Sequence, residues 1–199
     1  MNFFDYAFHH IGCVARLLRG DGKALGDMDI SADGFWRSFE AIPAALPALV
    51  FAWVFEARQI QASGKLDSLS SMIARMAVLE IVFWIAPLVV LAFVLRPLKL
   101  GHRFPHLVIS RNWLSALLSY VFVAVSLIEL VFNAGQTSNT TALLALITMG
   151  LMLWFSVTVT RVALNVPQLT AVAFVAVETL VTYPLAVFAY GAAGLYPAA

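Results

Sequence analysis

The chain has 199 residues, of which 62% are hydrophobic and 12% are charged, and its mean hydropathy is +0.90. A soluble domain of this size needs far less apolar surface, so the composition predicts an integral membrane protein. The formal net charge of +1, without a long block of like charges, excludes a broad basic surface for nucleic acid, and the single cysteine, Cys13, excludes an intrachain disulfide.

Residues 1–19 are predicted to form an amphipathic helix that does not cross the membrane. Apolar side chains recur at three- and four-residue spacing from Phe4 to Phe8 and Ile11, whereas Arg16 and Arg19 lie largely elsewhere around the helix. Two arrangements fit this pattern: the helix lies flat on the membrane surface, with both arginines near anionic head groups, or it packs against the transmembrane bundle. Because charged residues interrupt the apolar run, we do not expect a cleaved signal peptide.

Residues 20–34 are predicted to form a mobile polar linker into a transmembrane domain of residues 35–199. A membrane span needs about 20 mostly apolar residues, because the hydrocarbon core is about 30 Å thick and an α-helix rises about 1.5 Å per residue. The short connection between the last two qualifying segments predicts an antiparallel helical hairpin. The sequence therefore predicts an all-α membrane protein, a bundle of five transmembrane helices with an N-terminal amphipathic interfacial helix. The five segments are 41–57, 76–95, 113–132, 142–163 and 169–190.

The basic residues are distributed unevenly between the two sides of such a bundle. With five spans, nine of the twelve Lys and Arg residues fall on the side that holds the N-terminus. The positive-inside rule places the more basic loops in the cytoplasm, so we expect a cytoplasmic N-terminus and an external C-terminus. This orientation depends on the shortest segment, 41–57, crossing the membrane. If that segment were re-entrant, the charge bias would disappear.

Glutamates inside the predicted spans are the first candidate functional residues, because ionisable groups at membrane depth are energetically costly. Glu80 and Glu129 fall near the outer ends of their spans, close to the level of Glu56. These carboxylates could bind a cation or share protons, or they could be boundary residues in water or paired with arginines. Glu178 lies about 13 Å inside the last span. It is either protonated and hydrogen-bonded to nearby threonines or it faces an aqueous cavity, and Arg161 is the basic residue of the adjacent span.

The segment 101–113, between the second and third predicted spans, is the second candidate. It combines basic, amide and aromatic side chains, among them Arg103, Arg111, Asn112 and Trp113. This composition suits contact with lipid head groups or a partner protein. The alternative is structural: Trp113 anchors the third span at the interface, Asn112 caps its start, and the charges only set topology. Pro105 argues against a regular helix in this stretch.

The sequence offers no motif for catalysis, cofactor binding or metal binding. His102 and His106 have helical spacing, but no carboxylate lies near them in sequence to complete a metal site. The chain has neither a glycine loop for phosphate nor a GxSxG elbow. We therefore predict a protein that is not an enzyme and that needs no cofactor or metal.

The overall layout resembles that of the Yip1-type membrane proteins: a polar N-terminal region with an amphipathic helix, five spans, short later loops and an external C-terminus. Residues 103–113, RFPHLVISRNW, are similar to a segment of small bacterial inner-membrane proteins. The resemblance implies a location in the bacterial inner membrane, with a periplasmic C-terminus, and a non-enzymatic role. Eukaryotic members of the family act in vesicle trafficking with small GTPases. It implies no functional residue.

Two functions are compatible with these features. The first is a structural, adaptor or membrane-organising role in which the N-terminal helix and segment 101–113 contact the lipid bilayer, a protein partner or a second copy of the chain. The second is a small oligomeric transporter or channel subunit that uses Glu178, with Glu129 or Glu80, for proton or cation passage. A structure that shows whether Glu178 faces a cavity or a sealed interface would distinguish the two.

Overall fold

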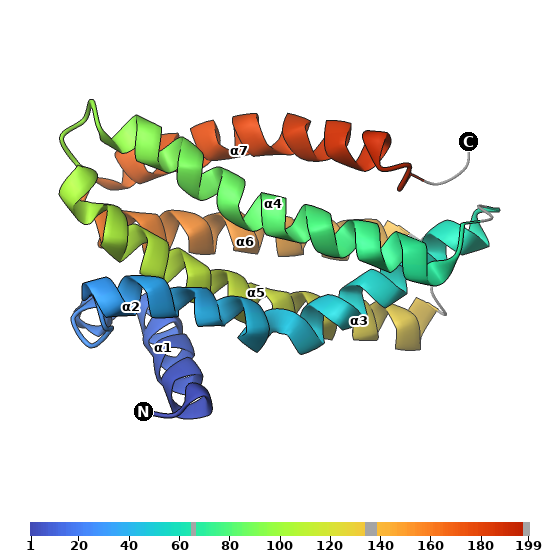
Figure 1. The fold of residues 1–199 in the computed structure, drawn as a ribbon, viewed down its shortest axis with the longest axis horizontal. Helices are drawn as coiled ribbons and strands as arrows, with labels where there is room; N and C mark the ends of the chain where they lie inside the picture. The colour runs from blue at the N-terminus through green and yellow to red at the C-terminus, as the bar shows by residue number, and fades with distance from the viewer. Residues whose placement is uncertain (65–66, 134–138, 197–199) are drawn as a thin grey trace.

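The computed structural model describes residues 1–64, 67–133 and 139–196, and all regular secondary structure in these ranges is helical. Within them, five helical segments are long and apolar enough to cross a membrane. They lie side by side along the long axis of the molecule (Figure 1). The prediction of an all-α, five-helix transmembrane bundle is confirmed. The spanning helices are α3 (Ala41–Ala62), α4 (Leu69–Leu95), α5 (Phe104–Asn133), α6 (Asn139–Leu164) and α7 (Gln168–Ala192).

Successive spans run in opposite directions. Helices α3, α5 and α7 begin at one end of the bundle, which we call the N-terminal end, and α4 and α6 finish there (Figure 1). The turn between α6 and α7 contains Asn165 with a φ of 55°, a left-handed conformation that asparagine tolerates better than most residues. Helices α6 and α7 pack against each other. They form the antiparallel hairpin that their short connection predicts.

The first span is longer than its apolar segment. Helix α3 contains 22 residues, which corresponds to about 33 Å at the helical rise. It is preceded without a break by α2 (Ala32–Arg37) and the 3-10 helix η2 (Ser38–Glu40). Together they give an apolar helical stretch of 31 residues, Ala32–Ala62. Residues 41–57 therefore belong to a full-length span, and the re-entrant alternative is wrong.

The third span begins earlier than predicted. Helix α5 starts at Phe104, after the short 3-10 helix η3 (Gly101–Arg103). Pro105 therefore lies in its first turn, where a backbone N–H would have no intrahelical acceptor and proline does no harm. The expectation that Pro105 prevents a helix was wrong for this reason. Arg111, Asn112 and Trp113 lie two to three turns inside α5 instead of at its start.

Residues 20–34 differ from the expected mobile linker. The segment holds a 3-10 helix, η1 (Gly22–Leu25), and the N-cap of α2, where the Ser31 side chain accepts a hydrogen bond from the Gly34 N–H at 3.0 Å. Arg16 forms ion pairs with Asp21 at 2.6 Å and Asp27 at 2.7 Å. Polar groups in this segment thus make specific contacts instead of remaining solvated, and they attach it to the preceding helix.

Helix α1 (Phe3–Leu18) lies at a steep angle to the spans and packs beside the N-terminal half of α5 (Figure 1). The packing alternative is confirmed for one face of the helix, which includes Tyr6, His10 and Leu17, all at most 3% exposed. The face predicted to be apolar is a different one: Phe4 is 68% exposed and Phe8 is 73% exposed. Helix α1 therefore has two apolar faces, and the one with the two phenylalanines points away from the bundle.

Candidate functional site

A cavity of about 380 Å³ lies inside the bundle, and all five spans contribute to its walls. Its position follows from side chains that share one face of each helix. On α4, Glu80, Trp84 and Pro87 have i, i+4, i+7 spacing, and on α5 Arg111 and Ser115 have i, i+4 spacing. The charged, amide and serine side chains that reach the cavity are, in chain order, Glu56, Glu80, Arg111, Asn112, Ser115, Ser119 and Glu178.

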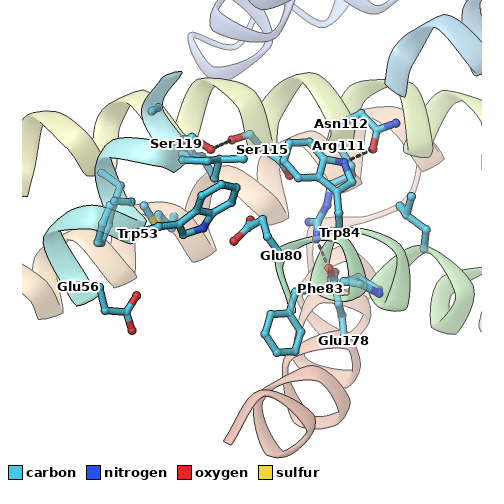
Figure 2. Close-up of a pocket in the computed structure, with 18 of the residues that line it drawn as sticks. Trp53, Glu56, Glu80, Phe83, Trp84, Arg111, Asn112, Ser115, Ser119 and Glu178 are labelled. Atoms are coloured by element: carbon cyan, nitrogen blue, oxygen red, sulfur yellow. Dashed lines mark hydrogen bonds and ion pairs between the residues drawn. The ribbon is translucent and has the colours of Figure 1, made fainter. Parts of the chain in front are cut away.

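Glu178 of α7 forms an ion pair with Arg111 of α5 (Figure 2). The side chains are only 9% and 13% exposed, respectively. The Arg111 guanidinium also lies 3.5 Å from the Thr160 hydroxyl of α6. This ion pair explains why a carboxylate is tolerated so deep in an apolar bundle, because a buried charge needs a partner of opposite sign. Glu178 lines the cavity and is paired as well, so both sequence-based alternatives were incomplete.

Sequence reasoning did not identify the partner of Glu178. Arg161, on the adjacent span, is exposed and is not that partner. Two of the threonines considered, Thr179 and Thr182, donate to backbone carbonyls of their own helix at 2.8 Å. Arg111 was placed in a loop because α5 was predicted to start at residue 113. Its place at the head of a polar stripe on one face of α5, continued by serines at i+4 and i+8, is the signal that would have shown its role.

Glu56 and Glu80 occupy the rest of the acidic lining. On α3, Leu49, Trp53 and Glu56 share one face of the helix at i, i+4 and i+7, and all three line the cavity. In Figure 2 the Glu80 carboxylate lies between the indole rings of Trp53 and Trp84. Glu56 is close enough to Glu80 for their charges to interact. The two carboxylates therefore form one acidic region, built from α3 and α4.

Of the predicted cluster of Glu56, Glu80 and Glu129, the structure describes the side chains of Glu56 and Glu80. Glu56 and Glu80 share one cavity, but with Glu178 as the third carboxylate. Glu129 belongs to α5, and its side chain lies outside the part of the chain that the structure describes. The depth of a residue in its own span thus predicted two members of the group, and the packing of α7 against the other spans supplies the third.

The sequence also left open that Arg75 pairs with Glu56 or Glu80, and this alternative is wrong. Arg75 of α4 donates to the Asp67 carboxylate at 2.8 Å and to the Ala193 carbonyl at 2.6 Å. These bonds hold the start of α4 to the end of α7. The guanidinium is therefore committed to a contact outside the cavity, and Arg75 is not among the residues that line it.

Asn112 is a structural residue in the cavity wall. It is 1% exposed. Its Oδ1 accepts a hydrogen bond from the Trp84 indole N–H at 3.0 Å, and its Nδ2 donates to the Ser38 hydroxyl at 2.9 Å. Ser38 in turn donates to the Phe35 carbonyl at 2.6 Å. This chain of hydrogen bonds joins α4, α5 and the start of the first span, so Asn112 neither caps α5 nor faces a partner.

The remaining residues of the predicted contact surface divide into buried and exposed ones. Trp113 is 0% exposed, and its ring lies 5.4 Å from that of His10 and 5.8 Å from that of Tyr6, measured between centroids. It is a core residue that holds α1 on the bundle, and it is not an interfacial anchor. Arg103 is half-buried in η3, and Arg19 is exposed at the end of α1. These two arginines, unlike Trp113, remain near the surface.

The charge of the cavity lining is unbalanced. Among the described residues, three carboxylates face one guanidinium, and that guanidinium is paired with Glu178. Glu56 and Glu80 are half-buried and have no such cation beside them in the described lining of the cavity, so a positive charge that enters the cavity would be stabilised there. Within the same part of the chain, no three His, Cys, Asp or Glu side chains come together in a group that could hold a metal ion. The acidic groups are spread along the cavity instead of converging on one point.

Comparison with family models, with curated proteins and with solved structures gives no match for this chain. The site is therefore interpreted from its own geometry.

Proposed function

We propose that the protein binds a cationic solute or protons in this cavity and passes them across the membrane as a small oligomeric transporter or channel subunit. The single observation that carries the proposal is the excess of carboxylates in a cavity to which all five spans contribute. Since Arg111 and Glu178 compensate each other, Glu56 and Glu80 are the groups that would exchange a proton or a cation.

The depths of the three glutamates support passage along the cavity. Glu56 lies about 9 Å along the helix from the C-terminal end of α3, and Glu80 lies about 16 Å from the start of α4 at the same end of the bundle. Glu178 lies about 15 Å from the N-terminal end of α7. The acidic groups thus extend from one end of the bundle to its middle. With the N-terminus in the cytoplasm, as the basic residues predict, this acidic end faces the outside of a bacterial inner membrane.

The proposal is tested by flux into liposomes that contain the purified chain and the pH-sensitive dye pyranine. A potassium gradient with valinomycin drives protons, and uptake of sodium, potassium and methylammonium is measured separately. We expect faster flux of at least one of these ions than in empty liposomes. Glu80→Gln should slow that flux at least about tenfold, because it removes the charge and keeps the shape of the side chain. Asp33→Asn, an exposed acid outside the cavity, is the matched control and should behave as the unchanged chain does.

Two results would contradict the proposal. The first is flux equal to that of empty liposomes for protons and for every cation tested. The second is flux that Glu80→Gln and Glu56→Gln leave unchanged, because the ions would then pass by another route.

A membrane-organising role is the second candidate, and the outer face of α1 favours it. Phe4 and Phe8 are exposed on a helix that lies at a steep angle to the spans (Figure 1), an arrangement that suits insertion of both rings into the bilayer surface. In segment 101–113, Asn112 and Trp113 are buried and therefore do not contact lipid or a partner protein. Membership of the Yip1-type proteins stays a prediction.

Lipid contact by α1 is tested with a soluble peptide of residues 1–19. We expect the peptide to co-sediment with liposomes and the combined change Phe4→Ser and Phe8→Ser to weaken this binding, because it removes two apolar rings and keeps the charges. No binding of the unchanged peptide would contradict lipid contact through this face.

A further inference from the structure

The size of the cavity distinguishes between classes of cation. Its volume is about 380 Å³, whereas one water molecule occupies about 30 Å³ in the liquid. A proton or a dehydrated metal ion would leave most of this space to water. Pockets for small organic molecules begin at about 300 Å³. The cavity therefore has the volume of an organic ligand.

Aromatic rings form much of the remaining wall. Trp53, Phe83, Trp84, Phe122 and Tyr190 all line the cavity. Phe83 of α4 and Tyr190 of α7 stack with ring centroids 6.2 Å apart and an angle of 16° between their planes. The face of an aromatic ring attracts a cation within about 6 Å of its centroid, and tryptophan does so most strongly. These rings therefore suit the positive charge that the glutamates also favour.

The acidic and aromatic groups are combined at one place. Figure 2 shows the Glu80 carboxylate between Trp53, whose indole N–H donates a hydrogen bond to it, and Trp84, with Phe83 beside it on α4. A metal ion such as Ca²⁺ or Mg²⁺ requires about six oxygen ligands that converge on one point, which this arrangement lacks in the described residues. An ammonium group needs only one or two carboxylates and is stabilised by ring faces around it.

We infer that the cavity binds an organic ammonium ion with an aromatic or aliphatic group, its charge beside Glu80 and between the rings of Trp53 and Trp84. The inference rests on the proposed function and specifies the class of its ligand. Arg111 lies farther along the cavity, where its positive charge disfavours a second cation. The apolar part of the ligand contacts the leucines that line the same cavity, Leu49, Leu88 and Leu118.

The test measures binding of 2-phenylethylammonium to the full chain in detergent, through the change in tryptophan fluorescence. The neutral analogue 2-phenylethanol has nearly the same shape and lacks the charge. We expect saturable binding of the ammonium ion and at least about tenfold weaker binding of the alcohol. Glu80→Gln should weaken binding of the ammonium ion at least about tenfold. Trp53→Leu should weaken it about threefold to tenfold, because the aromatic ring and its hydrogen bond to Glu80 are lost while an apolar side chain is kept.

Trp154→Leu is the matched control, because Trp154 is 56% exposed on α6 and does not line the cavity. Its affinity for the ammonium ion should equal that of the unchanged chain. If the unchanged chain bound the alcohol and the ammonium ion with equal affinity, that result alone would overturn the inference. Proton or potassium flux that depends on Glu80, together with no binding of 2-phenylethylammonium, would overturn the inference and leave the proposed function standing. Absence of both flux and binding would overturn both.

Discussion

Arg111 of α5 and Glu178 of α7 form an ion pair inside the five-helix bundle, where each side chain is at most 13% exposed. The pair joins two spans that are far apart in the sequence. It also forms part of the cavity wall, so its charges act on any ion that enters as well as on the packing of the two helices. The stability of the bundle should therefore depend on both partners being present or both being absent.

The first prediction concerns removal of one partner of this pair. Glu178→Leu leaves the Arg111 guanidinium buried without its counter-charge, which should lower the free energy of unfolding by about 3–5 kcal/mol. The double variant with Arg111→Leu should recover most of this loss, because no uncompensated charge remains. Thermal unfolding in detergent, followed by circular dichroism, gives both values. Arg161→Leu, a change at an exposed arginine, is the control and should not change stability. Additive losses in the double variant would contradict the coupling.

The second prediction concerns the hydrogen bonds of Asn112. Asn112→Leu leaves the Trp84 indole N–H and the Ser38 hydroxyl without their bonds to it, at distances of 3.0 and 2.9 Å in the intact protein. Leaving buried polar groups unpaired costs about 1–3 kcal/mol, so the variant should unfold at a clearly lower temperature. Ser119→Ala removes a hydroxyl that donates to a carbonyl of its own helix, that of Ser115, at 2.9 Å, and should have little effect. Equal effects of the two substitutions would exclude a special role for Asn112.

The sequence predicted the number of spans well because hydropathy is a local property and the α6–α7 turn is short. It did not locate Arg111, because the start of α5 depends on Pro105 being tolerated in a first helical turn. An error of about nine residues there placed two functional candidates, Arg111 and Asn112, in a loop instead of on a helix face. The partner of Glu178 is equally non-local: Arg111 is separated from it by 67 positions. Such pairs are fixed by packing between helices, which periodicity within one helix cannot show.

Helix α1 gives a second example of this limit. The stripe with Phe4 and Phe8 has the spacing of an apolar face, yet the buried face carries Tyr6 and His10. Histidine and tyrosine do not mark a core in a hydropathy pattern. They are buried here because Trp113 provides an aromatic surface for both rings. The Arg37 guanidinium, 3.7 Å from the centre of the Tyr6 ring, covers the same site.

The third prediction concerns the pH dependence of α1 packing. Burial lowers the pKa of His10 below its ordinary value of 6.5. The folded state therefore favours neutral His10. The contribution of neutral His10 to the stability of the folded state is complete above pH 6.5, and it is lost as the pH falls from 6.5 toward the lowered pKa. Reactivity of Cys13, the only cysteine of the chain and a buried residue of α1, reports release of the helix.

The rate of Cys13 modification is measured at each pH and divided by the rate for the unfolded chain, which corrects for the titration of the thiol itself. This relative rate should rise below pH 6.5. His10→Gln removes the titrating group and should abolish this increase, although it lowers stability at every pH. An increase that persists in His10→Gln would show that another group controls the packing of α1.

The last prediction concerns two glycines that differ in their surroundings. A Cβ at Gly34 of α2 would lie 2.0 Å from the Asp29 carbonyl oxygen, whereas a Cβ at Gly12 of α1 would meet no atom within 4 Å. Gly34→Ala must therefore push the backbone around Asp29 away from α2, at a cost of about 1–3 kcal/mol. Gly12→Ala should stabilise α1 by about 0.5–1 kcal/mol, because alanine loses less conformational entropy in a helix. Gly34→Ala should lower the unfolding temperature and raise the reactivity of Cys13, and Gly12→Ala should have the opposite effect on both. A neutral Gly34→Ala would show that the close contact between Asp29 and Gly34 does not constrain the start of α2.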